Sequence, residues 1–130
     1  DAPCSGLGTL RRNPAIKWRL TPKDIEDMAK LQAAILQSAS RLVKSGGRLV
    51  YATCSLLKEE NEAIALQFSA ANPDFKMLPV GEVLTQLKVE NVETLCSGTG
   101  QEGSMGTEYL RLWPHIHGTD GFFAAVWQRK

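Results

Sequence analysis

The chain has 130 residues, of which 43% are hydrophobic and 22% charged, and its formal net charge is +1. This length and balance are typical of one globular domain, and no apolar run approaches the roughly 18 residues that a membrane span needs. The charge by itself neither favours nor excludes a nucleic-acid partner. Three cysteines, an odd number, do not suggest a disulfide scaffold. We therefore expect a reducing, cytoplasmic setting, in which each cysteine is either a small buried hydrophobe or a working thiol.

The first predicted feature is a basic loop over residues 9–20. It holds four basic residues and one aromatic: Arg11, Arg12, Lys17, Arg19 and Trp18. Basic side chains suit a phosphate backbone, and an aromatic ring can stack on an unpaired base. Such a cluster is as commonly a solvated surface, so the pattern alone leaves both interpretations open.

A helix is predicted next, over about residues 24–43. Thr21 can cap it, Pro22 suits the first helical position, and Asp24 stands where a capping-box acid belongs. Apolar residues recur at three- and four-residue steps, which predicts one apolar stripe of an amphipathic helix: Ile25, Met28, Leu31, Ile35, Ala39, Leu42 and Val43. The glycines at 46 and 47 end the helix.

A strand and a second helix follow. RLVYATC, residues 48–54, is short, rich in β-formers and mostly apolar, which predicts a strand buried on both faces. The second helix is predicted over about 58–71, ending at Asn72-Pro73. Helix, glycine turn, strand and helix in succession favour an α/β fold with a parallel sheet and crossover helices.

The last part of the chain is predicted to end in a β-hairpin. VGEVLTQL (80–87) is compatible with a short helix, and the segment 97–107, with four glycines, is expected to be a loop. EYLRLWP and GFFAAVWQR are predicted strands. They are joined by HIHGTD, in which Asp120, followed by Gly121, is a turn signal.

Cys4 and Cys54 each follow a strand end in this interpretation. Cys54 closes the strand 48–54, and Cys4 lies in DAPCSGLG, which is typical of a loop that leaves a strand. Ligands of open parallel sheets bind outside the carboxyl ends of the strands. If the two strands are neighbours, both thiols face one crevice with Asp1 at its rim. Backbone N–H groups of a following helix would help to hold a thiolate there. Spacing alone leaves open that both cysteines merely pack in the core.

A zinc site is the alternative for these side chains. Its candidate ligands are Cys4, Cys54, Cys96, His115 and His117. The sequence has no C-x-x-C pair, and its cysteines are 50 and 42 residues apart. Structural zinc sites show close pairs. We therefore expect no metal.

Three segments share features with one known family. DAPCSGLGTLRRNPAIKW, GGRLVYATCSLLKEENE and RLWPHIHGTDGFFAAVW together resemble the S-adenosylmethionine-dependent RNA (cytosine-5) methyltransferases of the Sun/Fmu type, which modify small-subunit ribosomal RNA. The resemblance implies a Rossmann-like class I methyltransferase sheet of seven strands, in the order 3-2-1-4-5-7-6, with the last strand antiparallel. Residues 1–130 would be the C-terminal half of that catalytic domain. They would begin at the end of strand 4 and contain strands 5, 6 and 7. The cofactor-binding N-terminal half would be absent.

The resemblance also implies roles for single residues. Cys54, in Thr-Cys-Ser, matches the family's nucleophile, which adds to C6 of the cytosine so that C5 can take the methyl group. Cys4 matches the cysteine that assists release of the product. Asp1 matches the aspartate that contacts the target base, and Asp1 and Pro3 are the expected contacts to S-adenosylmethionine in this chain.

RNA contacts and association are expected as well. Arg11, Arg12 and Lys17 match the family's basic segment and are the expected contacts to ribosomal RNA, whose target base must be unstacked. The 130 residues alone are expected to be inactive and to self-associate, through the open edge of strand 48–54 or the exposed face of helix 24–43. The alternative function is a non-catalytic RNA-binding or scaffold module that keeps the fold, although the presence of both cysteines favours the enzyme.

Overall fold

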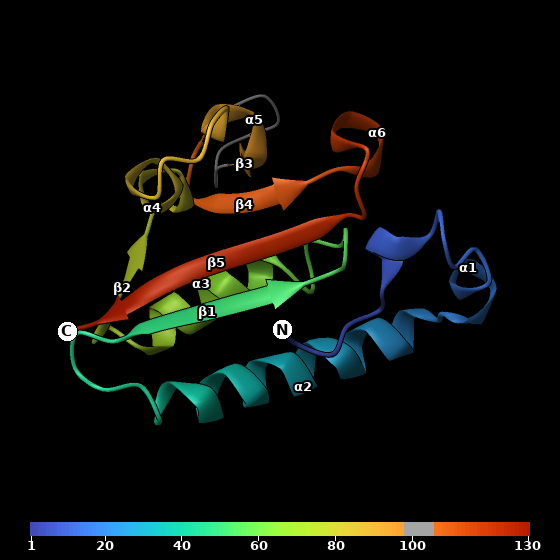
Figure 1. The fold of residues 1–130 in the computed structure, drawn as a ribbon. Helices are drawn as coiled ribbons and strands as arrows, with labels where there is room; N and C mark the ends of the chain where they lie inside the picture. Colours follow the sequence, from blue (N-terminus) through green and yellow to red (C-terminus); the bar gives the residue numbers. More distant parts are fainter. Residues whose placement is uncertain (98–105) are drawn as a thin grey trace.

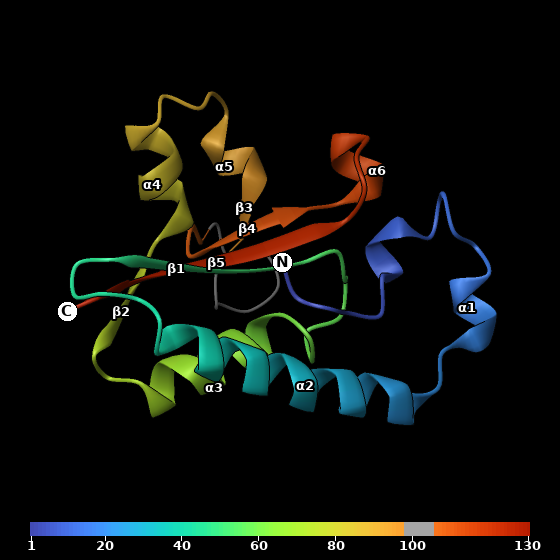
Figure 2. The same cartoon turned by 60° about the horizontal axis from the view of Figure 1, so that its bottom comes forward.

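The computed structural model describes residues 1–97 and 106–130, so most of the predicted loop 97–107 lies outside the described residues. The strands are β1 (Arg48–Thr53), β2 (Phe75–Leu78), β3 (Cys96–Ser97), β4 (Tyr109–Leu112) and β5 (Phe122–Arg129). The helices are η1 (Leu7–Thr9), α1 (Ile16–Arg19), α2 (Pro22–Ser40), α3 (Glu62–Ala71), α4 (Val80–Gln86), α5 (Val92–Leu95) and α6 (Pro114–His117). The strands form one sheet (Figure 1). In Figure 2, α2 and α3 lie on one side of this sheet and α4 and α5 on the other.

The order of the strands follows from the position of β5 at the centre. β1 pairs with one side of β5, from Arg48↔Gln128 to Thr53↔Phe123. β4 and β2 share the other side of β5, and β3 pairs with β4. The spatial order β1-β5-β4 corresponds to strands 5-7-6 of the sheet that the resemblance implies. The last strand in the chain, β5, is antiparallel to its neighbours β1 and β4, which confirms that prediction.

The prediction of parallel pairing is wrong for the described strands. Every pair among them is antiparallel. β1 and β4 do run in the same direction, because each is antiparallel to β5, but β5 lies between them. The crossover through α3 therefore returns the chain to a parallel orientation without making the two strands neighbours.

Helix α2 begins where its capping signal predicts. The Thr21 hydroxyl accepts from the Asp24 backbone N–H at 3.3 Å, and the Asp24 carboxylate accepts from the Thr21 backbone N–H at 2.8 Å. The helix ends at Ser40, before the predicted 43. The predicted apolar stripe is only partly correct, because Leu31 and Ile35 are 45% and 40% exposed. The face against the sheet carries other residues: Ala29, Gln32, Ala33, Leu36 and Ser40.

The core lies between the sheet and the pair α2 and α3. Trp127 of β5 is fully buried, and its ring packs edge-on against Phe68 of α3, with centroids 5.0 Å apart. Leu49 and Tyr51 of β1 face this core, but Val50 is 54% exposed. The prediction that both faces of this strand are buried is therefore wrong, because the face opposite this core is left uncovered at Val50.

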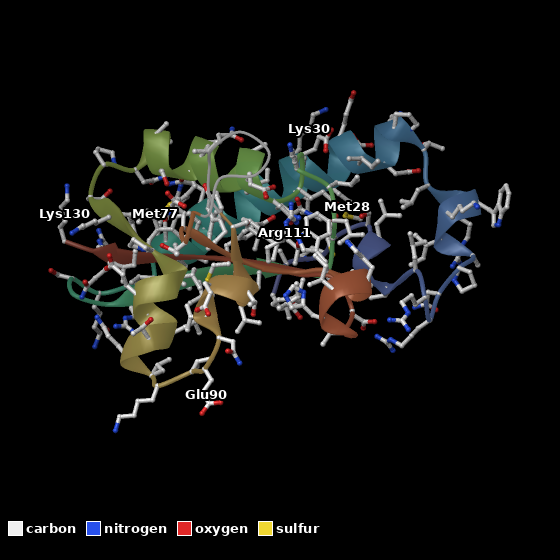
Figure 3. The ribbon with its side chains drawn as sticks, turned by 90° about the horizontal axis from the view of Figure 1, so that it is seen from above. Met28, Lys30, Met77, Glu90, Arg111 and Lys130 are labelled. Carbon is white, nitrogen blue, oxygen red and sulfur yellow. The ribbon has the colours of Figure 1, made fainter. Side chains whose placement is uncertain are left out.

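A largely buried ion pair joins β4 to α3. Arg111 is only 3% exposed and donates to Glu62 of α3 at 2.7 Å. Figure 3 shows Arg111 in the middle of the molecule, whereas Lys30, Glu90 and Lys130 point outward. Charged side chains are almost never buried unless they are paired, so this contact fixes α3 against the sheet.

Local details differ from the sequence prediction at three places. α3 begins at Glu62 rather than 58, because residues 58–61 form a turn. The predicted hairpin turn between β4 and β5 is replaced by the short helix α6. The residue with positive φ in this connection is Gly118, at 67°, and not Gly121. β2 and β3 are additional strands, whereas the short helix predicted within 80–87 is present as α4. No helix of the described residues is long and apolar enough to cross a membrane.

Candidate active site

The structure brings Cys4 and Cys54 together. The segment before η1 runs beside the end of β1 (Figure 1), where the Ala2 N–H donates to the Ala52 carbonyl and the Gly8 N–H donates to the Cys54 carbonyl, each at 2.8 Å. Between these two backbone bonds, the Cys4 Sγ lies 3.3 Å from the Cys54 Sγ. Both thiols are free. One end of the sheet thus presents two sulfur atoms side by side.

Gly8 and Gly121 allow the first loop to pack closely against the end of β1 and the start of β5. A Cβ on Gly8 would lie 2.3 Å from the Gly121 carbonyl oxygen and 2.6 Å from that of Cys54. The Gly121 N–H in turn donates to the Gly8 carbonyl at 2.8 Å. The Asp120-Gly121 sequence therefore serves a backbone contact at the site, and not a left-handed turn.

Burial dominates the electrostatics of the Cys4 thiol. Burial, with a hydrogen bond from Cys54 second, raises the pKa of Cys4 to about 11. Cys4 is therefore a protonated thiol at neutral pH. No helix begins directly after Cys54, since α3 starts only at Glu62, so the predicted helix N–H groups are not present there. At Cys4, backbone hydrogen bonds at Gly6 and Cys54 lower the pKa, but burial outweighs them.

Buried polar side chains hold the turn around Cys54. The Thr53 hydroxyl donates to the Asn61 side-chain carbonyl, and the Asn61 amide donates to the Ser55 carbonyl at 2.9 Å. The Ser55 N–H donates to the Thr53 hydroxyl at 3.2 Å. All three side chains are fully buried. Sequence reasoning missed Asn61 and its neighbour Glu60, because a run such as KEENE is ordinarily solvated.

Asp1 and Pro3 lie at the open side of this end of β1. Both are exposed, and the Pro3 carbonyl accepts from the Gln32 side chain at 2.8 Å. Within the described residues no hydrogen bond reaches the Asp1 carboxylate. An exposed carboxylate three residues before Cys4 and a fixed loop backbone are compatible with contacts to a base or a cofactor.

The three predicted RNA contacts are exposed but are not equivalent. Arg12 forms a two-pronged pair with Asp120, and this pair holds the pKa of the Asp120 carboxyl below its usual value. Arg11 donates to the Pro114 carbonyl at 3.3 Å, and the Lys17 ammonium lies 4.9 Å from the Trp18 ring centre.

A groove lies between the first loop and α6. It has a volume of about 890 Å³, and its wall includes Leu10, Arg11, Leu56, Trp113, His115 and Ile116. Leu56 follows Cys54 by two residues in the chain, but neither Cys4 nor Cys54 lines the groove. Figures 1 and 2 both show α6 beside the η1 segment.

The histidines and Cys96 do not join the thiol pair. His117 contacts the Trp113 backbone N–H at 2.8 Å and the Thr94 carbonyl at 2.7 Å, and His115 is exposed. Cys96 lies on β3, and burial raises its pKa. No group of three potential metal ligands occurs among the residues that the structure describes.

Comparison with known proteins gives the class and then the family. The chain resembles the crystal structure of NSun6 from Pyrococcus horikoshii, solved with SFG, with a TM-score of 0.68 and 32% identity over 99% of this chain and 28% of that one. A methyltransferase homolog protein from the same organism has a TM-score of 0.67 and 32% identity, over 100% of this chain and 37% of that one. The fold is therefore that of a methyltransferase.

The sequence comparisons narrow this class. The family model of the 16S rRNA methyltransferase RsmB/F matches residues 1–128. The probable ribosomal RNA small subunit methyltransferase B of Synechocystis is 42% identical over 96% of this chain and 25% of its own length. The chain belongs to the RsmB/F family of 16S rRNA methyltransferases, and it spans about a quarter of the length of the relative it matches.

Proposed function

We propose that the complete protein transfers a methyl group from S-adenosylmethionine to C5 of a cytosine in small-subunit ribosomal RNA, through a covalent bond between Cys54 and C6. The observation that carries this proposal is the pair of sulfurs 3.3 Å apart at the end of β1. A reaction that forms and then breaks a bond to one thiol has a use for a second thiol in contact with it. A ribosomal RNA substrate, like the free cysteines, fits a cytoplasmic location.

The chemistry assigns a separate task to each thiol. The Cys54 sulfur, as the thiolate, adds to C6, and C5 becomes an enamine-like nucleophile. S-adenosylmethionine, when bound, would supply the methyl group to C5 and leave as S-adenosylhomocysteine. A base then removes the C5 proton, the C5–C6 double bond re-forms, and Cys54 leaves as a thiolate. Cys4, whose pKa is about 11, keeps its S–H at neutral pH and can donate a hydrogen bond to that leaving thiolate. This is how Cys4 would assist release.

Asp1 and Pro3 would orient the reactants. An exposed carboxylate at the rim of the thiol site suits the amino edge of cytosine and would favour a base protonated at N3. The Pro3 segment, which Gln32 holds in place, would border the cofactor. SFG in the NSun6 structure is an analogue of S-adenosylmethionine, which supports this choice of cofactor.

The groove beside α6 would guide the RNA to the site. Arg11, which lines the groove, and Lys17, in the same basic loop, keep exposed positive charge for phosphate contacts, whereas the charge of Arg12 is already shared with Asp120. The exposed His115 ring and Ile116 side chain of α6 suit an unstacked base.

The whole activity belongs to a longer protein in this proposal. The chain matches about a quarter of the Synechocystis relative, so we propose that residues 1–130 form part of the catalytic domain and carry its thiol site. The 130 residues alone should then neither bind S-adenosylmethionine with micromolar affinity nor methylate RNA.

Mechanism-based trapping tests the function. RNA that contains 5-fluorocytosine should form a covalent complex with the complete enzyme and the cofactor, because fluorine at C5 cannot leave as the proton does. Cys54→Ser should form no adduct and transfer no methyl group. Cys4→Ala should accumulate an adduct with ordinary RNA that survives denaturing gels. If the wild type is never trapped, the proposal gives way to the non-catalytic scaffold.

A further inference from the structure

A buried carboxylate joins the two loops that carry the cysteines. Glu60, in the turn before α3, is 0% exposed. Its Oε1 accepts from the Ser5 backbone N–H at 2.8 Å and from the Gln32 side-chain amide at 3.1 Å. Its Oε2 accepts from the Ser5 hydroxyl at 2.6 Å and also from the Ser55 hydroxyl. Four donors from three separate segments therefore converge on one side chain.

Two of these partners are the residues that directly follow the thiols. Ser5 follows Cys4, and Ser55 follows Cys54. The two hydroxyls lie 3.2 Å apart, and both donate to the same oxygen of Glu60. The position of Glu60 is itself fixed from β1, because the Tyr51 hydroxyl donates to its backbone carbonyl. The Glu60 carboxylate thus fixes the distance between the loop that carries Cys4 and the loop that carries Cys54.

A glutamate suits this position better than any neutral side chain. An ionised carboxylate only accepts hydrogen bonds, and it can accept at both oxygens, whereas an amide accepts at one atom and donates at the other. The backbone bonds at Ala2 and Gly8 lie on either side of Cys4, but they leave Pro3–Ser5 to be held by side chains. The side chains that hold this stretch are Glu60 and Gln32.

We propose that Glu60 is a positioning residue that keeps the Cys4 and Cys54 sulfurs in contact, and that this contact sets the rate of the thiol chemistry. The effect on catalysis rests on the proposed function. The effect on the geometry of the thiols does not, and can be measured without RNA.

The kinetic test uses Glu60→Gln and Glu60→Ala in the complete enzyme. The matched control is Glu59→Gln, which makes the same change of charge at the exposed neighbouring position. A misplacement of about 1 Å can cost on the order of 100-fold in rate. We expect kcat for RNA methylation to fall on that order in Glu60→Ala and by a smaller factor in Glu60→Gln. The KM for RNA should stay unchanged in both Glu60 variants. In Glu59→Gln, kcat and KM should both equal the wild-type values.

The second readout is the rate at which diamide links Cys4 to Cys54. Diamide takes up the two thiol protons and two electrons, and one S–S bond of about 2.05 Å forms in place of the two S–H bonds. Mass spectrometry of the linked peptides follows this rate in the absence of RNA. The wild type and Glu59→Gln should react alike, and both Glu60 variants more slowly.

The outcomes separate the two ideas. Slower linking in the Glu60 variants, together with a wild type that does not methylate RNA, would support the positioning role and reject the proposed function. A methylating wild type whose Glu60→Gln variant matches it in kcat and in linking rate would overturn the positioning role. If Glu60→Ala fails to fold, Glu60→Gln carries the test. If Glu60→Gln also melts below the assay temperature and loses kcat for that reason, Glu60 is merely structural and the inference is wrong.

Discussion

Gly8→Ala should damage the thiol site through the backbone alone. The added Cβ would lie 2.3 Å from the Gly121 carbonyl oxygen and 2.6 Å from the Cys54 carbonyl oxygen, whereas ordinary contacts begin at 3.4 Å. Both obstacles are backbone atoms, so no side chain can rotate away. The first loop must move by about 1 Å, which strains the hydrogen bonds from Gly8 to Cys54 and from Gly121 to Gly8.

The magnitude follows from these contacts. Overpacking costs about 1–3 kcal/mol, and each weakened hydrogen bond adds up to about 1 kcal/mol. We expect a loss of about 2–4 kcal/mol in the free energy of unfolding from these two effects together. A shift of about 1 Å between the sulfurs should also lower kcat by on the order of 100-fold.

Urea unfolding and methyl transfer from labelled cofactor into RNA, both with the complete enzyme, measure the two effects. Gly46→Ala is the control, because its φ is +76° and nothing lies within 4 Å of the added Cβ. It should cost only the strain of a left-handed residue, about 1–2 kcal/mol, and leave kcat unchanged. A Gly8→Ala enzyme with wild-type stability and kcat would refute this account of the close approach.

Two further predictions concern charge and association. Because Arg12 lowers the pKa of Asp120 in the folded state, the stability from this pair is present above the unfolded pKa and is lost as the pH falls through the folded pKa. The destabilisation of Asp120→Asn in urea should therefore be measurable at pH 7 and should disappear at a pH below the folded pKa; an equal difference at both would contradict it. The 130-residue chain should self-associate through the part of the β1 edge before Ala52, because the first loop covers the end of the strand by bonding to the Ala52 and Cys54 carbonyls. Light scattering should show a dimer or larger species that Val50→Lys converts to monomer while Leu66→Lys on α3 does not; a wild-type monomer at tens of micromolar would rule this out.

The sequence by itself determined the features that depend on residues close together in the chain. The start of α2 could be predicted because Thr21 and Asp24 satisfy each other's backbone N–H groups within one turn. The strands β1 and β5 follow from short β-rich runs. Cys54 and Cys4 stand out because short motifs surround them and because the motifs resemble one family in their order.

Tertiary structure decided everything that rests on contacts across the fold. Periodicity indicated an apolar stripe on α2, but which side chains are buried depends on where the sheet lies, and β1 is an edge whose Val50 stays exposed. Arg12 meets Asp120 although 108 residues separate them. Glu60 and Asn61 are ordinary polar residues in the sequence, and they become buried only because three segments deliver donors to one place. A buried carboxylate is tolerated when its acceptors are satisfied, and whether they are satisfied is a property of the assembled fold, which no local pattern contains.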